Sequence, residues 1–496
     1  MPKINSIKFN FMMNSFLTAS SIIFPLITFP YVSRVLGPIG LGKVSFALSI
    51  TSYYSMFAQL GIPTYGIRTC AKIRDNKEEL TRTVQEIMII NLVMCFIVYI
   101  AFLISLTFIS KFRIDTSLFV ILSLSIIFNA LGVEWLYKSL EQYKYIAIRS
   151  IVFKIIALIA MFLMVRKQSD YIVYGGLSIL AAVGSNIFNF VNLRNLIYVT
   201  PISNYQFKRH LKPITIFFAM SVATTIYTHL DTVMLGFMKS DSDVGYYNAA
   251  VKIKGLLVNF VASLGTVLLP RVSYYIESGL REEFVKLTKK ALNFVVLLAI
   301  PLMIYFIIFA KQSILCIAGK NYTNSITPMI IIMPTILFIG LTNIIGIQIL
   351  VPLGREKVVL TSEIIGAIFN IIINILLIPK LVSSGAAIGT LVAELMVFVV
   401  QCYSLRNYVI PILKNMHWFK LSVSIIIATF SSFWIKNIEL SNIIILLLSS
   451  SVFFGIYMIM LIIFGETAEF KIHRTFQNNI NVIWKQVNYK FGKMQK

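Results

Sequence analysis

Ionisable residues within long apolar segments are the first candidates for chemistry in this sequence. A charge in hydrocarbon is costly, so such a residue is usually paired or functional. Seven lie within apolar segments and three arginines lie near segment ends: Glu134, Lys154, Asp231, Lys252, Lys254, Glu363 and Glu394, then Arg34, Arg68 and Arg271. A cation in such a position could attract an anion, and a carboxylate could hold a cation or a proton. The expected chemistry is therefore the binding of charged groups.

Motifs of covalent catalysis are absent from the sequence. It contains no GxxxxGK[ST], HExxH or GxSxG segment, and its four histidines are scattered: His210, His229, His417 and His473. The four cysteines are far apart and form no CxxC pair: Cys70, Cys95, Cys316 and Cys402. This spacing supports neither a disulfide framework nor a metal site. We therefore expect no enzymatic activity, no cofactor and no bound metal.

The composition is that of a membrane protein. Of the 496 residues, 58% are hydrophobic and only 13% are charged, whereas about a quarter of the residues of a soluble protein are charged. The apolar residues form runs of 20 or more, the length that a helix needs to cross a hydrocarbon core of about 30 Å. A water-soluble enzyme is excluded, and the fold class indicated is an all-α polytopic membrane protein.

Charge clusters and Pro/Gly breaks divide the sequence into about fourteen predicted transmembrane helices. The first apolar run is longer than a signal-peptide core and has no small-residue cleavage site, so we interpret it as a retained membrane helix. The predicted helices cover residues 9–33, 41–66, 84–110, 116–138, 145–165, 171–196, 213–238, 243–269, 290–311, 324–350, 357–379, 383–408, 417–436 and 440–464.

The basic residues predict the orientation of these helices. With a cytoplasmic N-terminus, 30 of the 44 lysines and arginines fall in cytoplasmic segments and 11 in external ones. Because cytoplasmic loops collect basic residues, both termini are expected to be cytoplasmic. The same rule explains the net charge of +24, and since no basic soluble domain is present, we expect no nucleic-acid partner.

Weak internal repeats predict two lobes in the same orientation. LGKVSFALSI (41–50) aligns with VGYYNAAVKI (244–253), and the same offset places Arg68 on Arg271. A second offset places residues 193–195 on 405–407, both Leu-Arg-Asn. We predict six-helix lobes at 1–212 and 213–410, an additional transmembrane hairpin at 411–464 and a basic cytoplasmic tail at 465–496. Parallel repeats are typical of transporters that work by alternating access.

Five segments resemble one known family, the Wzx-type polysaccharide flippases of the multidrug/oligosaccharidyl-lipid/polysaccharide exporter superfamily. They are PYVSRVLGPIGLGKVSFALSI (30–50), EWLYKSLEQYKYIAIRSI (134–151), HLDTVMLGFMKSDSDVGYYNAAVKI (229–253), LLPRVS (268–273) and VPLGREKVVLTSEIIGAIFNIIINILLIPKLVSSGAAIGTLVAE (351–394). The resemblance implies a multi-pass protein of the bacterial inner membrane. Its implied role is to move an undecaprenyl-diphosphate-linked oligosaccharide repeat unit to the outer leaflet, ahead of polymerisation into O antigen, capsule or exopolysaccharide. Besides membrane lipid, the polysaccharide polymerase and the chain-length regulator are implied candidate partners.

A diphosphate headgroup would need a polar, cationic path across the membrane, because an unpaired charge in hydrocarbon costs several kcal/mol or more. Lys154 is roughly 15 Å into its helix, so it either faces a central cavity or pairs with a carboxylate. Lys252 and Lys254 point to opposite sides of their helix, and Lys252 is favoured for the cavity because it shares a face with asparagines. Arg68 and Arg271 are candidates for an inner-mouth contact, although topology and snorkelling also explain them.

Arg34, near a helix end, completes the predicted cationic set. Among the carboxylates, Glu134 precedes Lys138 by four residues, so a local ion pair is sufficient to explain it. Asp231 lies at about the same depth as Lys252 on the neighbouring helix, and the two could form an ion pair, a transport site or both. Glu363 and Glu394 could bind a coupling ion, either H+ or Na+, or pair with a lysine.

Two prolines of the first helix, Pro25 and Pro30, remove backbone hydrogen bonds, so the helix could contain a hinge or a static kink. Three alternative functions stay open: a cation-coupled drug or metabolite antiporter of the same superfamily, a flippase for the peptidoglycan lipid precursor, and a non-transporting scaffold. Deep lysines and matched arginines favour an anionic substrate over the cationic substrate of an antiporter.

Overall fold

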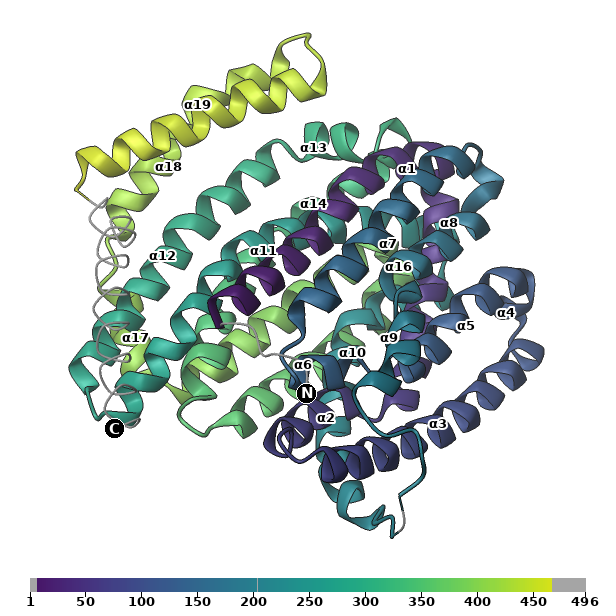
Figure 1. Cartoon of the computed structure of the whole chain (residues 1–496). Coiled ribbons are helices and arrows are strands. Elements are labelled where there is room, and N and C mark those ends of the chain that lie inside the picture. The colour runs from purple at the N-terminus through teal and green to yellow at the C-terminus, as the bar shows by residue number, and fades with distance from the viewer. Residues whose placement is uncertain (1–6, 203, 466–496) are drawn as a thin grey trace. The chain divides into compact units, whose positions relative to one another are not determined.

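The computed structural model describes residues 7–202 and 204–465, without the side chains at positions 7, 8, 11, 263–271, 273, 274 and 277. All regular elements in this part of the chain are helices, as the all-α prediction requires (Figure 1). The predicted basic tail lies outside the described residues from position 466 onward.

The helices and their bounds are α1 (Ile7–Gln59), α2 (Ile62–Lys72), α3 (Lys77–Phe108), α4 (Ser110–Ile114), α5 (Thr116–Leu131), α6 (Glu134–Ser139), α7 (Tyr143–Met164), α8 (Tyr171–Ile179), α9 (Asn186–Asn192), α10 (Lys208–Met238), α11 (Asp241–Glu277), α12 (Arg281–Ile308), α13 (Ala310–Ile317), α14 (Ile326–Ile332), α15 (Thr335–Thr342), α16 (Glu356–Ser404), α17 (Arg406–Lys414), α18 (Trp418–Phe433) and α19 (Asn442–Ile463). Short 3₁₀ or π segments are η1 (Gln168–Asp170), η2 (Leu180–Gly184), η3 (Leu193–Asn195), η4 (Lys320–Ser325), η5 (Asn343–Leu350) and η6 (Trp434–Asn437).

The helices match the predicted membrane spans. In the described part of the chain, ten are long and apolar enough to cross a membrane, and the bent pair Lys320–Ile332 with Thr335–Leu350 makes eleven. Both α1, which breaks at Gly37, and α16, which breaks at Val382, cover two predicted spans each. Counting these twice gives thirteen, and the remaining predicted span, 243–269, is covered by the helix α11.

The break in α1 lies away from the two prolines that the sequence suggested as a hinge. Gly37 has φ 65° and ψ −178°, a conformation that a residue with a Cβ rarely adopts. Pro38 follows it directly, whereas Pro25 and Pro30 have helical backbone within the first part of α1. The hinge at these two prolines stays a prediction.

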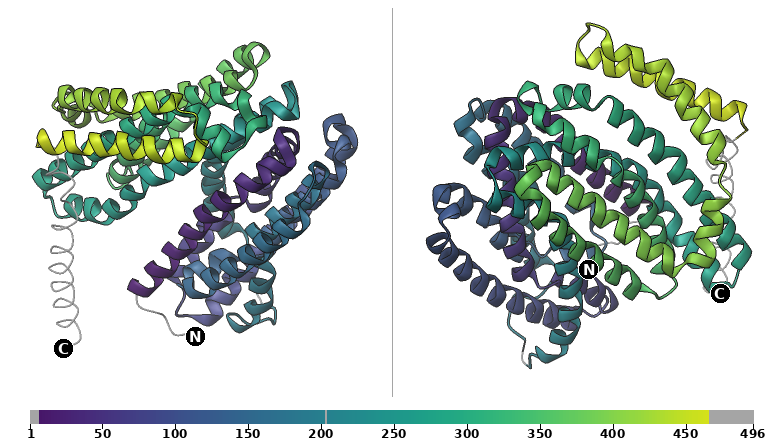
Figure 2. Two further views of the ribbon diagram at one scale, coloured as in Figure 1. Left: turned by 90° about the horizontal axis from the view of Figure 1, so that it is seen from above. Right: turned by 180° about the vertical axis from the view of Figure 1, so that it is seen from behind.

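One compact unit consists of Met1–Leu256, Ile314–Ile332 and Glu363–Met396. In it, α1 packs against α3, α5, α7 and α10, and Figure 2 shows the purple α1 beside the blue helices that follow it in the chain. Glu86 of α3 holds the start of α10 in place. Its buried carboxylate accepts hydrogen bonds from the Arg209 guanidinium at 2.7 Å and from the backbone N–H of Gln206 at 2.5 Å. A buried carboxylate needs such donors to offset its desolvation.

The other unit consists of Leu257–Ser313, Met333–Ser362 and Val397–Lys496. Here α18 and α19 form a long hairpin (Figure 1). The hydroxyl of Tyr305 donates to the Leu446 carbonyl at 3.0 Å, and that of Tyr457 donates to the Leu297 carbonyl at 2.7 Å. These two bonds join α12 to α19 and satisfy hydroxyls that would otherwise be buried without partners.

The two aligned glycines of the sequence repeat lie against each other in the first unit. A Cβ atom on Gly42 would come within 1.7 Å of the Asp241 carbonyl oxygen, and one on Gly245 within 2.1 Å of the Pro38 carbonyl oxygen. The second part of α1 and the start of α11 therefore cross with their backbones in contact. Small residues permit such close crossings of membrane helices.

We expect Gly245→Ala to force these backbones apart and to lower the free energy of unfolding by about 1 to 3 kcal/mol, the usual cost of overpacking. Thermal unfolding of the purified protein would measure this loss. Gly255→Ala in the same helix is the matched control, because a Cβ there meets no atom within 4 Å. Equal melting temperatures for the two variants would contradict the proposed close crossing.

Candidate functional site

A polar cavity of about 380 Å³ lies within the first unit. The second part of α1 contributes a polar face to it, with Thr51, Ser52, Ser55 and Gln59 separated by one to four residues. Residues three or four apart lie on one side of a helix, so these four side chains face the cavity together. The Gln59 amide donates to the Ser55 hydroxyl at 2.9 Å, which orders two of these groups.

The opposite wall comes from α10 and α5. Ser221, Thr225 and His229 repeat every four residues along α10, and Asn129 belongs to α5. His229 Nδ1 lies 3.3 Å from the Ser49 hydroxyl of α1. The π segment η2 also borders the cavity, and such segments often occur at functional sites. Among the described residues that line the cavity there is no carboxylate and no lysine or arginine, so its hydroxyl and amide groups suit a neutral, hydroxyl-rich ligand.

A second polar cluster surrounds Asp231 on α10. The carboxylate is 7% exposed and accepts four hydrogen bonds. Asn370 and Asn374 donate their amides to Oδ1 at 2.9 and 2.6 Å. Tyr247 and Thr390 donate their hydroxyls to Oδ2 at 2.7 and 2.6 Å. The partners of Asp231 are therefore neutral donors and not Lys252, the partner that the sequence suggested.

Three helical segments supply the donors to this carboxylate: α11 and the two halves of α16. The break at Val382 (φ 53°, ψ −125°) turns α16 back on itself, so that Thr390 comes beside Asn374. Gly389 makes the approach possible, because a Cβ there would lie 2.1 Å from the Asn374 Oδ1 atom. That Oδ1 atom is buried and has no hydrogen-bond partner among the described residues. The carboxylate and the Asn374 Oδ1 atom are oxygen ligands of the kind that hard cations prefer, and a cation that bound there would displace some of the hydrogen-bond donors from Asp231.

The structure does not bring Asp231 and Lys252 together. No ion pair joins them among the described residues, which contradicts the pairing suggested by their equal depth. Lys252 is exposed and does not line the polar cavity, although it lies within electrostatic reach of His229, which does. Lys254, on the other side of α11, lies within reach of the buried Glu394. The two lysines thus have different charged or titratable neighbours, and the assignment of Lys252 to the substrate cavity stays a prediction.

Lys154 finds hydroxyls instead of a carboxylate. Its ammonium group donates to the Ser20 hydroxyl at 2.9 Å and to the Ser21 hydroxyl at 2.7 Å, both on α1. Glu134 pairs with Lys138 at 2.8 Å, as the four-residue spacing predicts, and lies 3.6 Å from Arg149. Local pairing thus accounts for Glu134, while Lys154 retains a positive charge without a carboxylate within ion-pair distance in the described structure.

The predicted arginines are dispersed. The Arg34 guanidinium donates to backbone carbonyls, those of Pro30 in its own helix and of Cys316 and Ile317 at the end of α13, a position where helix carbonyls need donors. Arg68 is exposed and makes no ion pair with a described residue. The side chain of Arg271 lies outside the described residues.

Sequence reasoning missed the polar cavity and the neutral partners of Asp231. A search for ionisable residues overlooks them, because both sites are made mainly of Ser, Thr, Asn, Gln and Tyr. A signal was available: the polar stripe from Thr51 to Gln59 interrupts an apolar helix at helical spacing. Glu363, which was predicted, is partly buried and forms no ion pair with a described residue.

Family comparisons cover most of the chain. The family model described as "Polysaccharide biosynthesis protein" matches residues 8–276, and the one described as "MatE" matches residues 216–376. The chain is 25% identical over 394 residues to the "Putative O-antigen transporter" of Escherichia coli (strain K12), covering 78% of this chain and 94% of that protein. It is 23% identical over 381 residues to the protein of the same description from Shigella dysenteriae, covering 76% of this chain and 94% of that one.

The fold also has a solved counterpart. The "Lipid II flippase MurJ, inward closed conformation" superposes with a TM-score of 0.66 at 18% sequence identity, covering 90% of this chain and 99% of that one. At this identity the likeness concerns the fold alone.

The hydrogen-bond pattern around Asp231 predicts how two substitutions combine. Asp231→Ala should lower the free energy of unfolding by about 1 to 3 kcal/mol, because it leaves buried donors without their acceptor. Lys252→Ala should change it by less than about 0.5 kcal/mol. If the two do not interact, the double variant will equal the sum within about 0.5 kcal/mol, as measured by thermal unfolding of all four proteins. Recovery of stability in the double variant would instead demonstrate an ion pair.

Proposed function

The chain belongs to the polysaccharide biosynthesis protein family, and from this membership we propose that it is a flippase for lipid-linked oligosaccharides. Its proposed substrate is an undecaprenyl-diphosphate-linked repeat unit for O antigen, capsule or exopolysaccharide, carried across the bacterial inner membrane by alternating access. The transport involves no covalent chemistry. The description of the E. coli and Shigella relatives as O-antigen transporters supports this assignment.

The observation that carries the proposal is the polar cavity of about 380 Å³ within otherwise apolar helices. Sugar hydroxyls donate and accept hydrogen bonds, and an unassisted passage through hydrocarbon would leave them unbonded at a cost of several kcal/mol each. Serine, threonine, asparagine and glutamine side chains replace water as partners. We therefore assign the cavity to the oligosaccharide.

The diphosphate requires positive charge rather than hydroxyls. Lys252 is the first candidate because it is exposed and within electrostatic reach of His229, a residue that lines the cavity. Lys154 is the second, because its hydrogen-bond partners are neutral hydroxyls and not a carboxylate. Arg68 and Arg271 remain proposed contacts at the cytoplasmic mouth. Arg34 is less suited, because backbone carbonyls already occupy its donors.

Orientation and partners complete the proposal. Both termini would be cytoplasmic, and six-helix lobes at 1–212 and 213–410 would alternate around the substrate with the hairpin at 411–464 as an addition. The non-helical backbone at Gly37 and the prolines at 25 and 30 are candidate hinges in α1. A polysaccharide polymerase and a chain-length regulator would receive the product on the outer side.

Deletion of the protein should abolish surface polymer and leave lipid-linked repeat units in the cytoplasmic leaflet. Re-expression of a Ser52→Leu variant should restore polymer at a level on the order of tenfold lower than the unmodified protein, because leucine narrows the cavity and removes a hydroxyl. Ser451→Leu is the matched control, since Ser451 is an exposed serine of α19. Polymer quantified from whole cells gives the readout.

The match of residues 216–376 to "MatE" keeps an antiporter as the second candidate function. The same deletion strain separates the two. Unchanged polymer together with a new sensitivity to cationic dyes would favour the antiporter and reject the flippase.

We further propose that the Asp231 cluster holds the coupling ion. Its oxygen donors and the unpartnered Asn374 Oδ1 atom support a cation there, and transporter sites of this kind bind Na+ or H+. A bound ion stabilises the folded protein by mass action.

At constant ionic strength, replacing K+ by Na+ should raise the melting temperature of the purified protein by a few degrees if the ion is Na+. If the ion is H+, the melting temperature should respond to pH and not to the exchange of K+ for Na+. Asp231→Asn should remove either response, whereas Glu283→Gln, at an exposed carboxylate, should retain it. A Na+ or pH response that persists in Asp231→Asn would place the ion elsewhere.

A further inference from the structure

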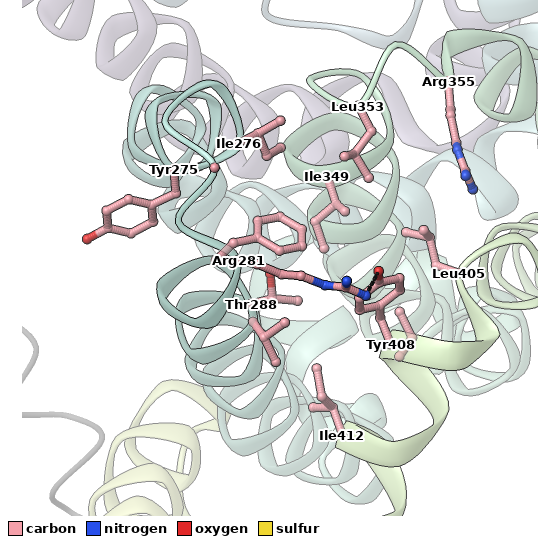
Figure 3. Close-up of a pocket in the computed structure, with 14 residues that line it drawn as sticks. Tyr275, Ile276, Arg281, Thr288, Ile349, Leu353, Arg355, Leu405, Tyr408 and Ile412 are labelled. Atoms are coloured by element: carbon pink, nitrogen blue, oxygen red, sulfur yellow. Dashed lines mark hydrogen bonds between the residues drawn. The ribbon is translucent and has the colours of Figure 1, made fainter.

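The second unit contains an apolar cavity of about 420 Å³ that the transport proposal does not use. Figure 3 shows its lining residues, which come from the α11–α12 turn, the end of η5 and the start of α17. Most of the wall is aliphatic or aromatic, including Ile276, Phe284, Val285, Ile349, Val409 and Ile412. Its volume falls within the range of about 300 to 1,000 Å³ that is usual for small-ligand sites.

A polar hollow of about 380 Å³ adjoins this cavity, with Arg355, Leu405 and Tyr408 lining both. Arg406 and Asn407 also line the hollow. Neither space has a carboxylate among its described lining residues. The pair therefore combines an apolar compartment with a cationic one.

Three arginines line one or both of the two spaces. The Arg281 guanidinium donates to the Tyr408 hydroxyl at 2.7 Å, a bond drawn in Figure 3, and lies 5.6 Å from the Tyr408 ring. Arg281, Arg355 and Arg406 form no ion pair with a described residue. Arg355 lines both spaces, Arg281 lines the apolar cavity and Arg406 lines the hollow, and guanidinium groups are suited to an anion with several oxygens.

The position along the helices places this site at a membrane surface. Arg281 begins the membrane-spanning helix α12, and Arg355 directly precedes α16. The apolar cavity extends from there along the first turns of α12 to Thr288, which is 3% exposed and whose hydroxyl has no hydrogen-bond partner among the described residues. A ligand that enters would thus meet positive charge first and then an apolar wall with one free hydroxyl.

We propose that this site binds an anionic membrane phospholipid, with its phosphate at Arg281, Arg355 and Arg406 and part of one acyl chain in the apolar cavity. The Thr288 hydroxyl is available to an ester carbonyl of the lipid. Basic pockets between membrane helices recognise acidic lipid headgroups in this manner. The bound lipid would join the α11–α12 turn to α16 and α17, a role separate from the transport of the oligosaccharide.

A phospholipid satisfies both halves of the site. Inorganic phosphate would fill only the cationic hollow, and a zwitterionic lipid would bring its own positive charge to the arginines. A polyprenyl phosphate carries the same charge on a much longer chain, and the binding measurement below distinguishes it from a phospholipid. The occupant that fits has one net negative headgroup and chains of ordinary length.

Lipid binding to the purified full-length protein can be measured by native mass spectrometry with phosphatidylglycerol and phosphatidylcholine of identical chains. Each arginine near a membrane surface is worth about 1 kcal/mol toward an acidic lipid. Arg281→Gln should therefore weaken phosphatidylglycerol binding about fivefold, and Arg281→Gln with Arg355→Gln about thirtyfold. Lys286→Gln is the matched control, because Lys286 is an exposed cation of the same helix that lines neither space. It should cause less than a twofold change.

Val285→Trp tests the apolar half, since it fills the cavity without changing charge and should weaken phosphatidylglycerol binding at least about fivefold. Equal binding of the two lipids, or an equal loss in Lys286→Gln, would show diffuse surface attraction and overturn the proposal. Competition by millimolar inorganic phosphate, or tighter binding of a polyprenyl phosphate, would also overturn it by identifying another occupant. Because these measurements involve no transport, their failure leaves the flippase assignment untouched.

Discussion

In hydrocarbon, a polar group has no water to bond, so each one must find its partner within the protein. Asp231 illustrates the constraint most fully: one carboxylate collects four donors from α11 and from both halves of α16. Those helices can deliver their donors only because Gly389 lets α16 fold closely on itself. The requirement of one charged group thereby determines where three helical segments must lie.

The same constraint explains why polar side chains gather instead of scattering. The serines, threonines and amides of α1, α5 and α10 bond to one another and to their own backbones, and they leave a cavity that can replace water for a ligand's hydroxyls. A hydroxyl or amide that is hydrogen-bonded in this way adds little desolvation cost to folding, and it can still exchange its partner for a ligand. Transport of a sugar headgroup requires that combination, since binding must be strong enough for entry and weak enough for release.

Charge is distributed differently in the two units. In the first, Lys154 donates to two serine hydroxyls and Lys252 is exposed, and we propose that both attract the anionic headgroup of the substrate. In the second, Arg281 and Arg355 border an apolar cavity at a span end, a setting that suits a resident lipid. Hydroxyl-rich surroundings favour the oligosaccharide in the first unit, and aliphatic surroundings favour a phospholipid in the second.

Much of the architecture could be predicted from the sequence, because a membrane span is a property of one continuous segment. Length and hydropathy located the helices, and helical periodicity placed Lys252 and Lys254 on opposite faces and paired Glu134 with Lys138. The partners of Asp231 could not be found in this way. Equal depth suggested Lys252, but depth says nothing of rotation about the helix axis, and packing turned Asp231 toward Asn370, Asn374, Tyr247 and Thr390. The polar cavity likewise exists only where helices distant in sequence meet, so tertiary structure alone decided which serines and threonines face one another.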